Sequence, residues 1–482
     1  MDIARRHPLG VKCTTDAAYA RFASSLAELL ENLNIEGFEG NNARQLAIVL
    51  TMYYEDMLAD LGIWNSLTDK MQELYHRQLP FYDVDMNAYY RNEPNADDVR
   101  FLIWLFMTRT EPAAVVSPDT PALDIAARAV CSLMDKRFEE MPVNDTLKEF
   151  FTKAEFAANY YAQRDILKWA EFSCYASCNE RAPELVAQQA QSLTRTLNCP
   201  PPVALNVAES ISVYENRLQP LAMRPQDWVA AIVRNNGNEE AAKKIASQRY
   251  LAFDFYRIID AKPGESITFE SVKGAKFTVS DENLCHPQKE CYDCKSMMAF
   301  FTEYDGQFYI GSQSSWADNT AAFDHEREQR KLNANLCLAN RRKLIDENGG
   351  SPLFYVKNSE QLRSFLTDMV GLPKKAVSQL TLPQEEVDFT IFVRESDYNV
   401  AFFPAVARYI RDGRNPFYDA DFAKDHAFSN IFMLPGDLLR YLHEHDMLPD
   451  ARINCFGGEE AGRKVVADNF DFFARMMQGN RY

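Results

Sequence analysis

The hydrophobic pattern of the chain changes its period near residue 250, and this change limits the possible folds more than any other feature. From about residue 14 to residue 244, apolar side chains recur at spacings of three and four, which is typical of amphipathic helices. Beyond residue 250, apolar and polar residues alternate, which indicates strands. The sequence therefore predicts a multidomain α+β protein whose first domain, residues 1–248, is all-helical.

Residues 249–320 are predicted to form a small antiparallel β module. Its five strands are expected at 253–261, 265–271, 276–280, 298–304 and 307–312. Asp305-Gly306 is a strong signal for a two-residue hairpin turn. This turn would pair Tyr304 with Gln307, Glu303 with Phe308, and Thr302 with Tyr309. Five strands this short favour a strongly bent sheet or a barrel, and the sequence leaves open whether it is SH3-like or OB-like.

Residues 321–482 show helical and strand patterns in turn, which predicts a mixed α/β domain. Helices are expected at 323–347, 359–370, 404–410, 435–445 and 459–477. A strand is expected at 352–356, and two paired strands at 388–393 and 399–403.

The composition bears on compartment and partners. The 52 basic and 69 acidic residues leave a net charge of −17, which disfavours general nucleic-acid binding and anionic membranes. The first residues lack the apolar core of a secretory signal, and the longest apolar run, 101–107, is too short to cross a bilayer. Ten cysteines are too few for a disulfide scaffold. We expect a cytoplasmic protein with reduced thiols and no membrane association, and the oligomeric state stays open.

The densest chemistry lies in the loop before the fourth predicted strand, where Cys285, Cys291 and Cys294 stand close in sequence. A Cys-x-x-Cys pair can share one zinc ion, and Cys285 could supply a third thiolate. A distant fourth ligand such as Cys337 or His325 would be needed, because His286 adjoins Cys285. A redox dithiol and plain reduced cysteines are the alternatives.

Other motifs fail at a residue that their chemistry requires. The stretch 457–464 resembles a phosphate loop, but Arg463 separates the last glycine from Lys464 and Val465 replaces the required hydroxyl. Cys174 and Cys178 share a helical face with no histidine nearby in sequence, which indicates core packing. No nucleophile elbow, zinc-protease or dinucleotide motif is present. The sequence does not decide whether the protein is an enzyme, but the failed motifs favour a non-enzymatic protein.

Several aromatic blocks resemble a known family. These are the sequences at 61–64, 79–83, 99–104, 415–418, 448–450 and 469–472. They are similar to a family of uncharacterised proteins from gut bacteria of the Bacteroides type, defined by a domain of unknown function. The resemblance implies a bacterial intracellular protein, and it transfers no active site.

Two functions are consistent with these patterns. The first is a non-enzymatic binding or adaptor protein that contacts a protein partner through Tyr304, Tyr309 and Trp316 of the β module, since such aromatic residues dominate interface hot spots. The second is a metalloprotein or enzyme with a zinc or redox site at Cys285, Cys291 and Cys294.

Overall fold

The computed structural model describes residues 3–110, 115–177, 182–197, 200–285, 287–383 and 386–478. The chain forms two compact units. The first contains Met1–Thr320 and Asn454–Ala461, and the second contains Ala321–Ile453 and Gly462–Tyr482. The first unit thus holds both residues 1–248 and residues 249–320. The division of this unit into two domains stays a prediction.

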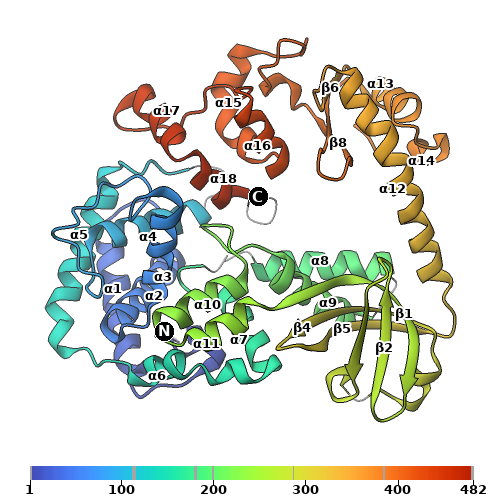
Figure 1. The fold of residues 1–482 in the computed structure, drawn as a ribbon. Helices are drawn as coiled ribbons and strands as arrows, with labels where there is room; N and C mark the ends of the chain where they lie inside the picture. The colour runs from blue at the N-terminus through green and yellow to red at the C-terminus, as the bar shows by residue number, and fades with distance from the viewer. Residues whose placement is uncertain are drawn as a thin grey trace. The chain divides into compact units, whose positions relative to one another are not determined.

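The N-terminal helical region was predicted correctly (Figure 1). Its α-helices are α1 (Asp16–Asn32), α2 (Gly40–Ala59), α3 (Ile63–Tyr75), α4 (Ala96–Thr110), α5 (Pro121–Arg137), α6 (Asp145–Lys153), α7 (Tyr160–Phe172), α8 (Ala182–Leu197), α9 (Pro201–Glu215), α10 (Pro225–Asn235) and α11 (Glu239–Ala246). Short 3-10 turns lie at Ala4–Arg6, Pro8–Gly10, Phe138–Glu140 and Glu155–Ala158.

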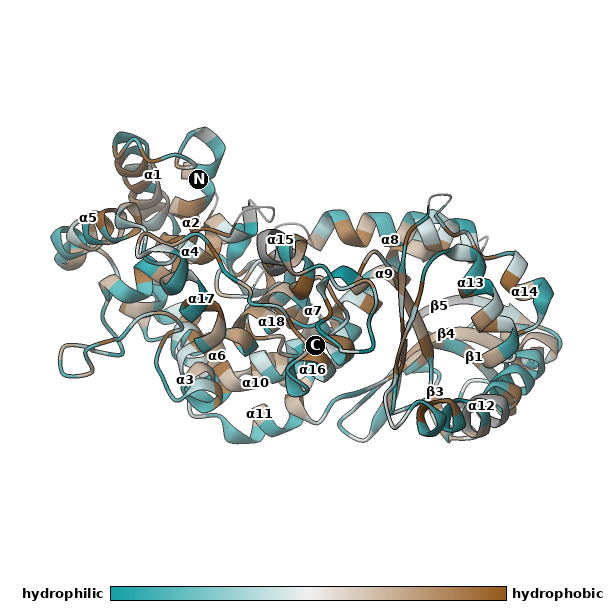
Figure 2. Cartoon of the chain, turned by 90° about the horizontal axis from the view of Figure 1, so that it is seen from above, coloured by the Kyte–Doolittle hydropathy of each residue, from teal (hydrophilic) through white to brown (hydrophobic). Residues whose placement is uncertain are grey.

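Local chemistry explains where these helices begin. Helices α9 and α10 start at Pro201 and Pro225, where the missing backbone N–H has no cost. The side chain of Asn159 accepts the N–H groups of Tyr161 and Ala162 and so caps α7. Along α8, hydrophobic and hydrophilic residues alternate in the pattern that lets one side face the protein core (Figure 2).

The β module is a curled, five-stranded antiparallel sheet in the order β3-β2-β1-β4-β5. Its strands are β1 (Arg249–Lys262), β2 (Ser266–Ser271), β3 (Lys276–Ser280), β4 (Ser296–Tyr304) and β5 (Gln307–Ala317). The three predicted hairpin pairs are confirmed, with Asp305 and Gly306 in the left-handed backbone region that such a turn requires. The curl brings the edge strands together, since the rings of Phe277 and Phe308 lie 4.7 Å apart.

The inner face of the curled sheet carries its hydrophobic core. Buried side chains from all five strands meet there, namely Tyr256, Ile267, Phe269, Phe277, Val279, Leu284, Met297, Ala299, Phe301 and Ile310, with Leu284 from the loop that follows β3. The opposite side of the hairpin contacts helices, because α9 packs against β5 and lies beside β4 and β5 in Figure 1.

The second unit contains an antiparallel sheet in the order β6-β7-β8. Its strands are β6 (Leu353–Val356), β7 (Phe389–Val393) and β8 (Val400–Pro404), so the predicted strand pair is confirmed. The helices are α12 (Ala321–Glu347), α13 (Ser359–Ser364), α14 (Lys374–Ser378), α15 (Ala420–Phe432), α16 (Gly436–Glu444), α17 (Gly458–Asp468) and α18 (Phe470–Gln478), with a π turn at Phe365–Met369. In the described part of the chain, no helix is long and apolar enough to cross a membrane.

Two helix predictions in this unit were wrong. Residues 404–410 form no α-helix, because Pro404 ends β8, Ala405 adopts a left-handed backbone conformation, and only Ala407–Tyr409 makes a 3-10 turn. Residues 459–477 form two helices, α17 and α18, which are separated at Asn469. The hydrophobic spacing is continuous across that break, so the sequence pattern did not reveal it.

Candidate functional site

The three loop cysteines occupy different surroundings. Cys285 is exposed and lies 3.6 Å from the hydroxyl of Tyr161, whereas the thiol of Cys294 faces the carbonyl oxygen of Glu290 at 3.5 Å. The three sulfur atoms do not all lie within 4.8 Å of one another. His286 and the side chain of Cys337 lie outside the described residues. Zinc or redox chemistry at this loop therefore stays a prediction.

The aromatic residues proposed for partner contact are partly used inside the first unit. Tyr304 is only 2% exposed, and its hydroxyl donates to the carbonyl oxygen of Ala157 at 2.7 Å. The prediction that Tyr304 presents a contact surface is corrected, because the helical region covers this face of the hairpin. Tyr309 and Trp316 are half-buried, and their contact with a partner stays a prediction.

The glycine-rich stretch 457–464 uses its backbone donors within the protein. The carboxylate of Asp119 accepts the N–H groups of Phe456 and Gly457, each at 3.3 Å. A side-chain anion thus holds two of the donors that a phosphate would need. Cys174 is buried, as expected for a core thiol, and Cys178 lies outside the described residues.

A cavity of about 330 Å³ lies where the sheet meets the helices of the first unit. Its lining comes from α7, α9, β5 and the cysteine loop, and consists of Tyr161, Arg164, Pro202, Val203, Asn206, Cys285, Ile310 and Gly311. The volume falls at the lower end of the range for small-molecule sites. Of the predicted site residues, Cys285 is the one found in this lining.

The first turn of α7 positions two polar side chains at the cavity. Tyr160 faces the sheet, where its hydroxyl contacts those of Tyr214 and Thr302, each at 3.3 Å. Tyr161 and Arg164, three residues apart on the same helix, line the cavity. Burial, together with the adjacent Cys285 thiol, raises the pKa of Tyr161, so its hydroxyl keeps a proton that it can donate.

Arg164 brings a positive charge to the cavity wall. Its Nη2 donates to the hydroxyl of Ser210 at 3.1 Å and to the side-chain oxygen of Asn206 at 3.4 Å. Its Nε is buried and has no hydrogen-bond partner among the described residues. Within the same part of the chain, no carboxylate forms an ion pair with it. The charge of Arg164 is therefore not neutralised by a carboxylate among the described residues.

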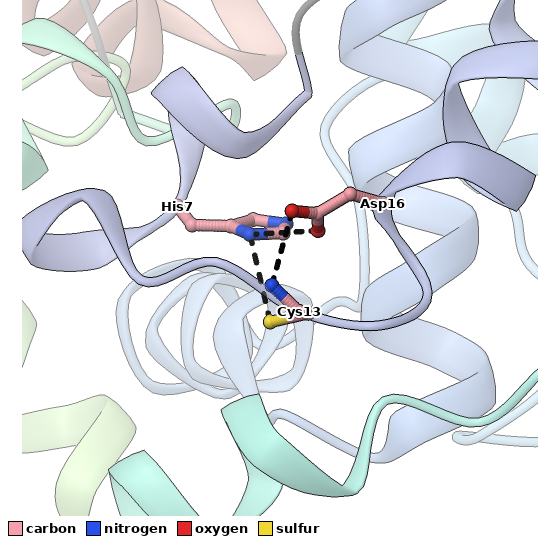
Figure 3. A group of neighbouring side chains, drawn as sticks. All are labelled: His7, Cys13 and Asp16. Carbon is pink, nitrogen blue, oxygen red and sulfur yellow. Dashed lines mark hydrogen bonds and ion pairs between the residues drawn. The ribbon is translucent and has the colours of Figure 1, made fainter.

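Residues of the N-terminal segment form a second polar cluster (Figure 3). His7 is fully buried and its Nε2 lies 3.0 Å from Oε2 of Glu55 in α2, which is also fully buried. On the other side of the ring, Nδ1 lies 3.8 Å from the sulfur of Cys13 and 3.5 Å from Oδ1 of Asp16. Burial lowers the pKa of His7, but the hydrogen bond and charge of Glu55, the carbonyl oxygen of Val11 and the charge of Asp16 together more than offset this, so the pKa is raised.

Apart from Cys285, the sequence patterns predicted neither the residues of the cavity nor those of the His7 cluster. Tyr161 and Arg164 belong to no motif, and His7 is 48 positions from Glu55. The cavity residues, and likewise His7 and Glu55, come together only when segments far apart in the chain pack against one another. The spacing of His7, Cys13 and Asp16 within one short segment is the one signal that could have drawn attention.

Comparison with known proteins identifies one family. A family model described as "Protein of unknown function (DUF3843)" matches residues 2–259 and 295–478. Searches of curated proteins and of solved structures returned no match. The unmatched segment between the two parts contains β2, β3 and all three loop cysteines, whereas the other cavity residues and the His7 cluster fall within the matched parts. Because the two matched parts span most of the sequence, the chain belongs to the DUF3843 family of proteins of unknown function.

Proposed function

We propose that this protein is a binding protein whose ligand site is the cavity between β5 and helices α7 and α9. The ligand class that fits is a small amphipathic carboxylate. The observation that carries the proposal is the positive charge of Arg164, which lines the cavity and forms no ion pair with a carboxylate among the described residues. This function develops the expected role of the β module as a contact surface.

The lining of the cavity combines an apolar wall with a few polar groups. Pro202 and Val203 supply apolar surface for the body of a ligand. Arg164 would pair with its carboxylate, and the Tyr161 hydroxyl is close enough to the same cavity to donate a second hydrogen bond. Such an arrangement orients a ligand with its charged end towards α7.

The charge of the whole protein acts against this recognition at long range. A net charge of −17 repels anions in bulk solution, so the attraction must come from Arg164 at short distance. Added salt should therefore weaken the long-range repulsion more than the short-range pair, because the partly buried pair is screened less.

The proposal is tested by isothermal titration of the protein with octanoate, using 1-octanol as the uncharged comparison. Octanoate should bind with one site per chain, and Arg164→Gln should weaken its binding about ten-fold or more, since a hydrogen bond to a charged group contributes roughly 1.5–3 kcal/mol. Arg128→Gln is the matched control, because Arg128 is exposed and pairs with Asp124 on the surface of α5.

A second variant separates charge from shape. Val203→Phe adds a ring to the cavity wall and leaves the charge unchanged, so it should weaken octanoate and 1-octanol alike. The proposal is contradicted if octanoate fails to bind, or if Arg164→Gln and Arg128→Gln affect its binding equally.

A further inference from the structure

The N-terminal segment places three different metal-binding side chains around one point. His7 follows the first 3-10 turn, Cys13 lies just before α1, and Asp16 is the first residue of that helix. Their ligand atoms all lie within 4.8 Å of one another, and no other group of three such residues meets this criterion in the part of the chain that the structure describes. Figure 3 shows the three side chains converging from one short N-terminal segment.

The spacing of the ligand atoms suits a tetrahedral zinc ion. Zinc binds nitrogen and oxygen at roughly 2.0–2.2 Å and sulfur at about 2.3 Å, so tetrahedral geometry separates nitrogen from sulfur by about 3.6 Å and nitrogen from oxygen by about 3.4 Å. The corresponding distances from Nδ1 of His7 are 3.8 Å to the Cys13 sulfur and 3.5 Å to Oδ1 of Asp16. These two distances are close to those of a tetrahedral zinc site.

The two oxygens of the Asp16 carboxylate have different surroundings, and one of them faces the proposed metal position. Its Oδ2 accepts the backbone N–H of Cys13 at 3.0 Å, which fixes the orientation of the group. Its Oδ1 is buried, lies 3.5 Å from Nδ1 of His7, and accepts no hydrogen bond from any residue that the structure describes. Burying a carboxylate oxygen without a hydrogen-bond donor or a cation lowers the stability of the folded state.

Metal binding through Nδ1 of His7 would replace the contact of this nitrogen with the backbone carbonyl oxygen of Val11 at 3.1 Å, and the other ring nitrogen is already supported. For Nδ1 to coordinate, the ring proton must reside on Nε2, where Oε2 of Glu55 can accept it at 3.0 Å. The other oxygen of Glu55 accepts a hydrogen bond from Asn144 at 2.7 Å, so the carboxylate is itself held in place. A carboxylate behind a histidine ligand is the usual support of zinc sites.

We propose that His7, Cys13 and Asp16 bind a zinc ion, with Glu55 and Asn144 as the supporting shell, and that this ion fastens the N-terminal segment to α1 and α2. The fourth position is left to a small ligand such as water. Coordination needs Cys13 as the thiolate and Nδ1 of His7 without a proton, so the entry of zinc releases any protons that these two atoms carry. The ion, one thiolate and one aspartate then leave the site close to neutral.

Titration of the chelator-treated, full-length protein with Co²⁺ tests this site, because cobalt takes the same ligands and reports them by absorption. One equivalent should produce the visible bands of a four-coordinate ion together with a sulfur-to-metal charge-transfer band. Zinc should then displace the cobalt. The metal should also raise the melting temperature, since it binds the folded state only.

Substitutions assign the ligands. Cys13→Ser should abolish the charge-transfer band, whereas Cys455→Ser, which changes a half-buried thiol outside the group, should leave it unchanged. Glu55→Gln keeps the shape of the supporting group and should weaken binding about 10–100-fold. If Cys13→Ser unfolds the protein, Asp16→Asn provides the test, because Asp16 is partly exposed and should lose affinity while the protein stays folded.

Three results would overturn the proposal. The first is the absence of a stoichiometric cobalt complex. The second is a complex without the sulfur band. The third is a complex that persists in Cys13→Ser and disappears when Cys291 and Cys294 are changed to Ser, which would place the ion in the cysteine loop instead.

Discussion

The ring of Tyr309 in β5 stacks on the ring of Tyr160 at the start of α7, with centroids 4.2 Å apart and planes inclined by 17°. This contact joins the hairpin to the helical region within the first unit. It also fixes the first turn of α7, which carries Tyr161 and Arg164 to the cavity. The stacked pair therefore links the stability of the hairpin to the geometry of the proposed ligand site.

Replacing Tyr309 with Leu should destabilise the protein. The change keeps an apolar side chain but removes the stacking, which contributes about 0.5–1.5 kcal/mol beyond the area that the ring buries. The free energy of unfolding in urea should fall by roughly this amount or more. Tyr90→Leu is the control, because Tyr90 is 62% exposed. Equal effects of the two substitutions would show that the stacked pair adds no stability.

A buried carboxyl group should make stability depend on pH. Asp98 lies in the core with two tyrosine hydroxyls donating to its Oδ2, and burial raises its pKa from 3.8 to about 7. The folded state therefore holds this proton more tightly than the unfolded state does. Ionisation of Asp98 therefore lowers the free energy of unfolding as pH rises from about 4 to about 7. Above the folded pKa, this decrease is complete.

Asp98→Asn removes this charge and keeps the side-chain shape, so it should raise the free energy of unfolding most at high pH. Relative to the original protein, the free energy of unfolding of Asp98→Asn should increase between pH 4 and pH 7, by roughly 4 kcal/mol, and then level off. The control Asp83→Asn changes an exposed residue and should show no such trend. A difference that stays flat across this range would contradict a raised pKa at Asp98.

Gly462 should tolerate no side chain. A Cβ atom at this position would lie 2.0 Å from the backbone carbonyl oxygen of Ile453, so α17 or the segment before it would have to shift. Gly462→Ala is expected to cost at least 1–3 kcal/mol of stability, in the manner of overpacked sites. Gly413→Ala is the matched control, because a Cβ there meets nothing within 4 Å. A melting temperature lowered equally in both variants would refute the steric explanation.

Local signals explain which parts of the fold could be predicted. The Asp305-Gly306 turn determines the hairpin register by itself, because the turn type sets which residues face each other. Strand β3 was predicted with its observed ends, since Phe277 and Val279 alternate with polar residues between clear turn signals. The break at Asn469 was missed, because the hydrophobic spacing continues through it.

The sites depend on contacts between distant parts of the chain, and sequence patterns contain little information about these. The exposed or buried state of Tyr304 depends on which hairpin face the helices cover, and alternation alone cannot tell the two faces apart. Cys285 was singled out for a metal, yet the structure places it at a cavity beside Tyr161. Arg164 is one of many arginines in the sequence, and only the fold shows that it lines a cavity without a paired carboxylate among the described residues.

The most direct test of the proposed ligand site uses Cys285 as a reporter. The rate at which iodoacetamide alkylates Cys285 is measured by mass spectrometry with and without saturating octanoate, and Cys294, another loop thiol outside the cavity lining, serves as the internal control. A ligand in the cavity should slow alkylation of Cys285 several-fold, leave Cys294 unchanged, and lose this effect in Arg164→Gln. An unchanged rate at Cys285, or an equal slowing of both thiols, would contradict binding at this cavity.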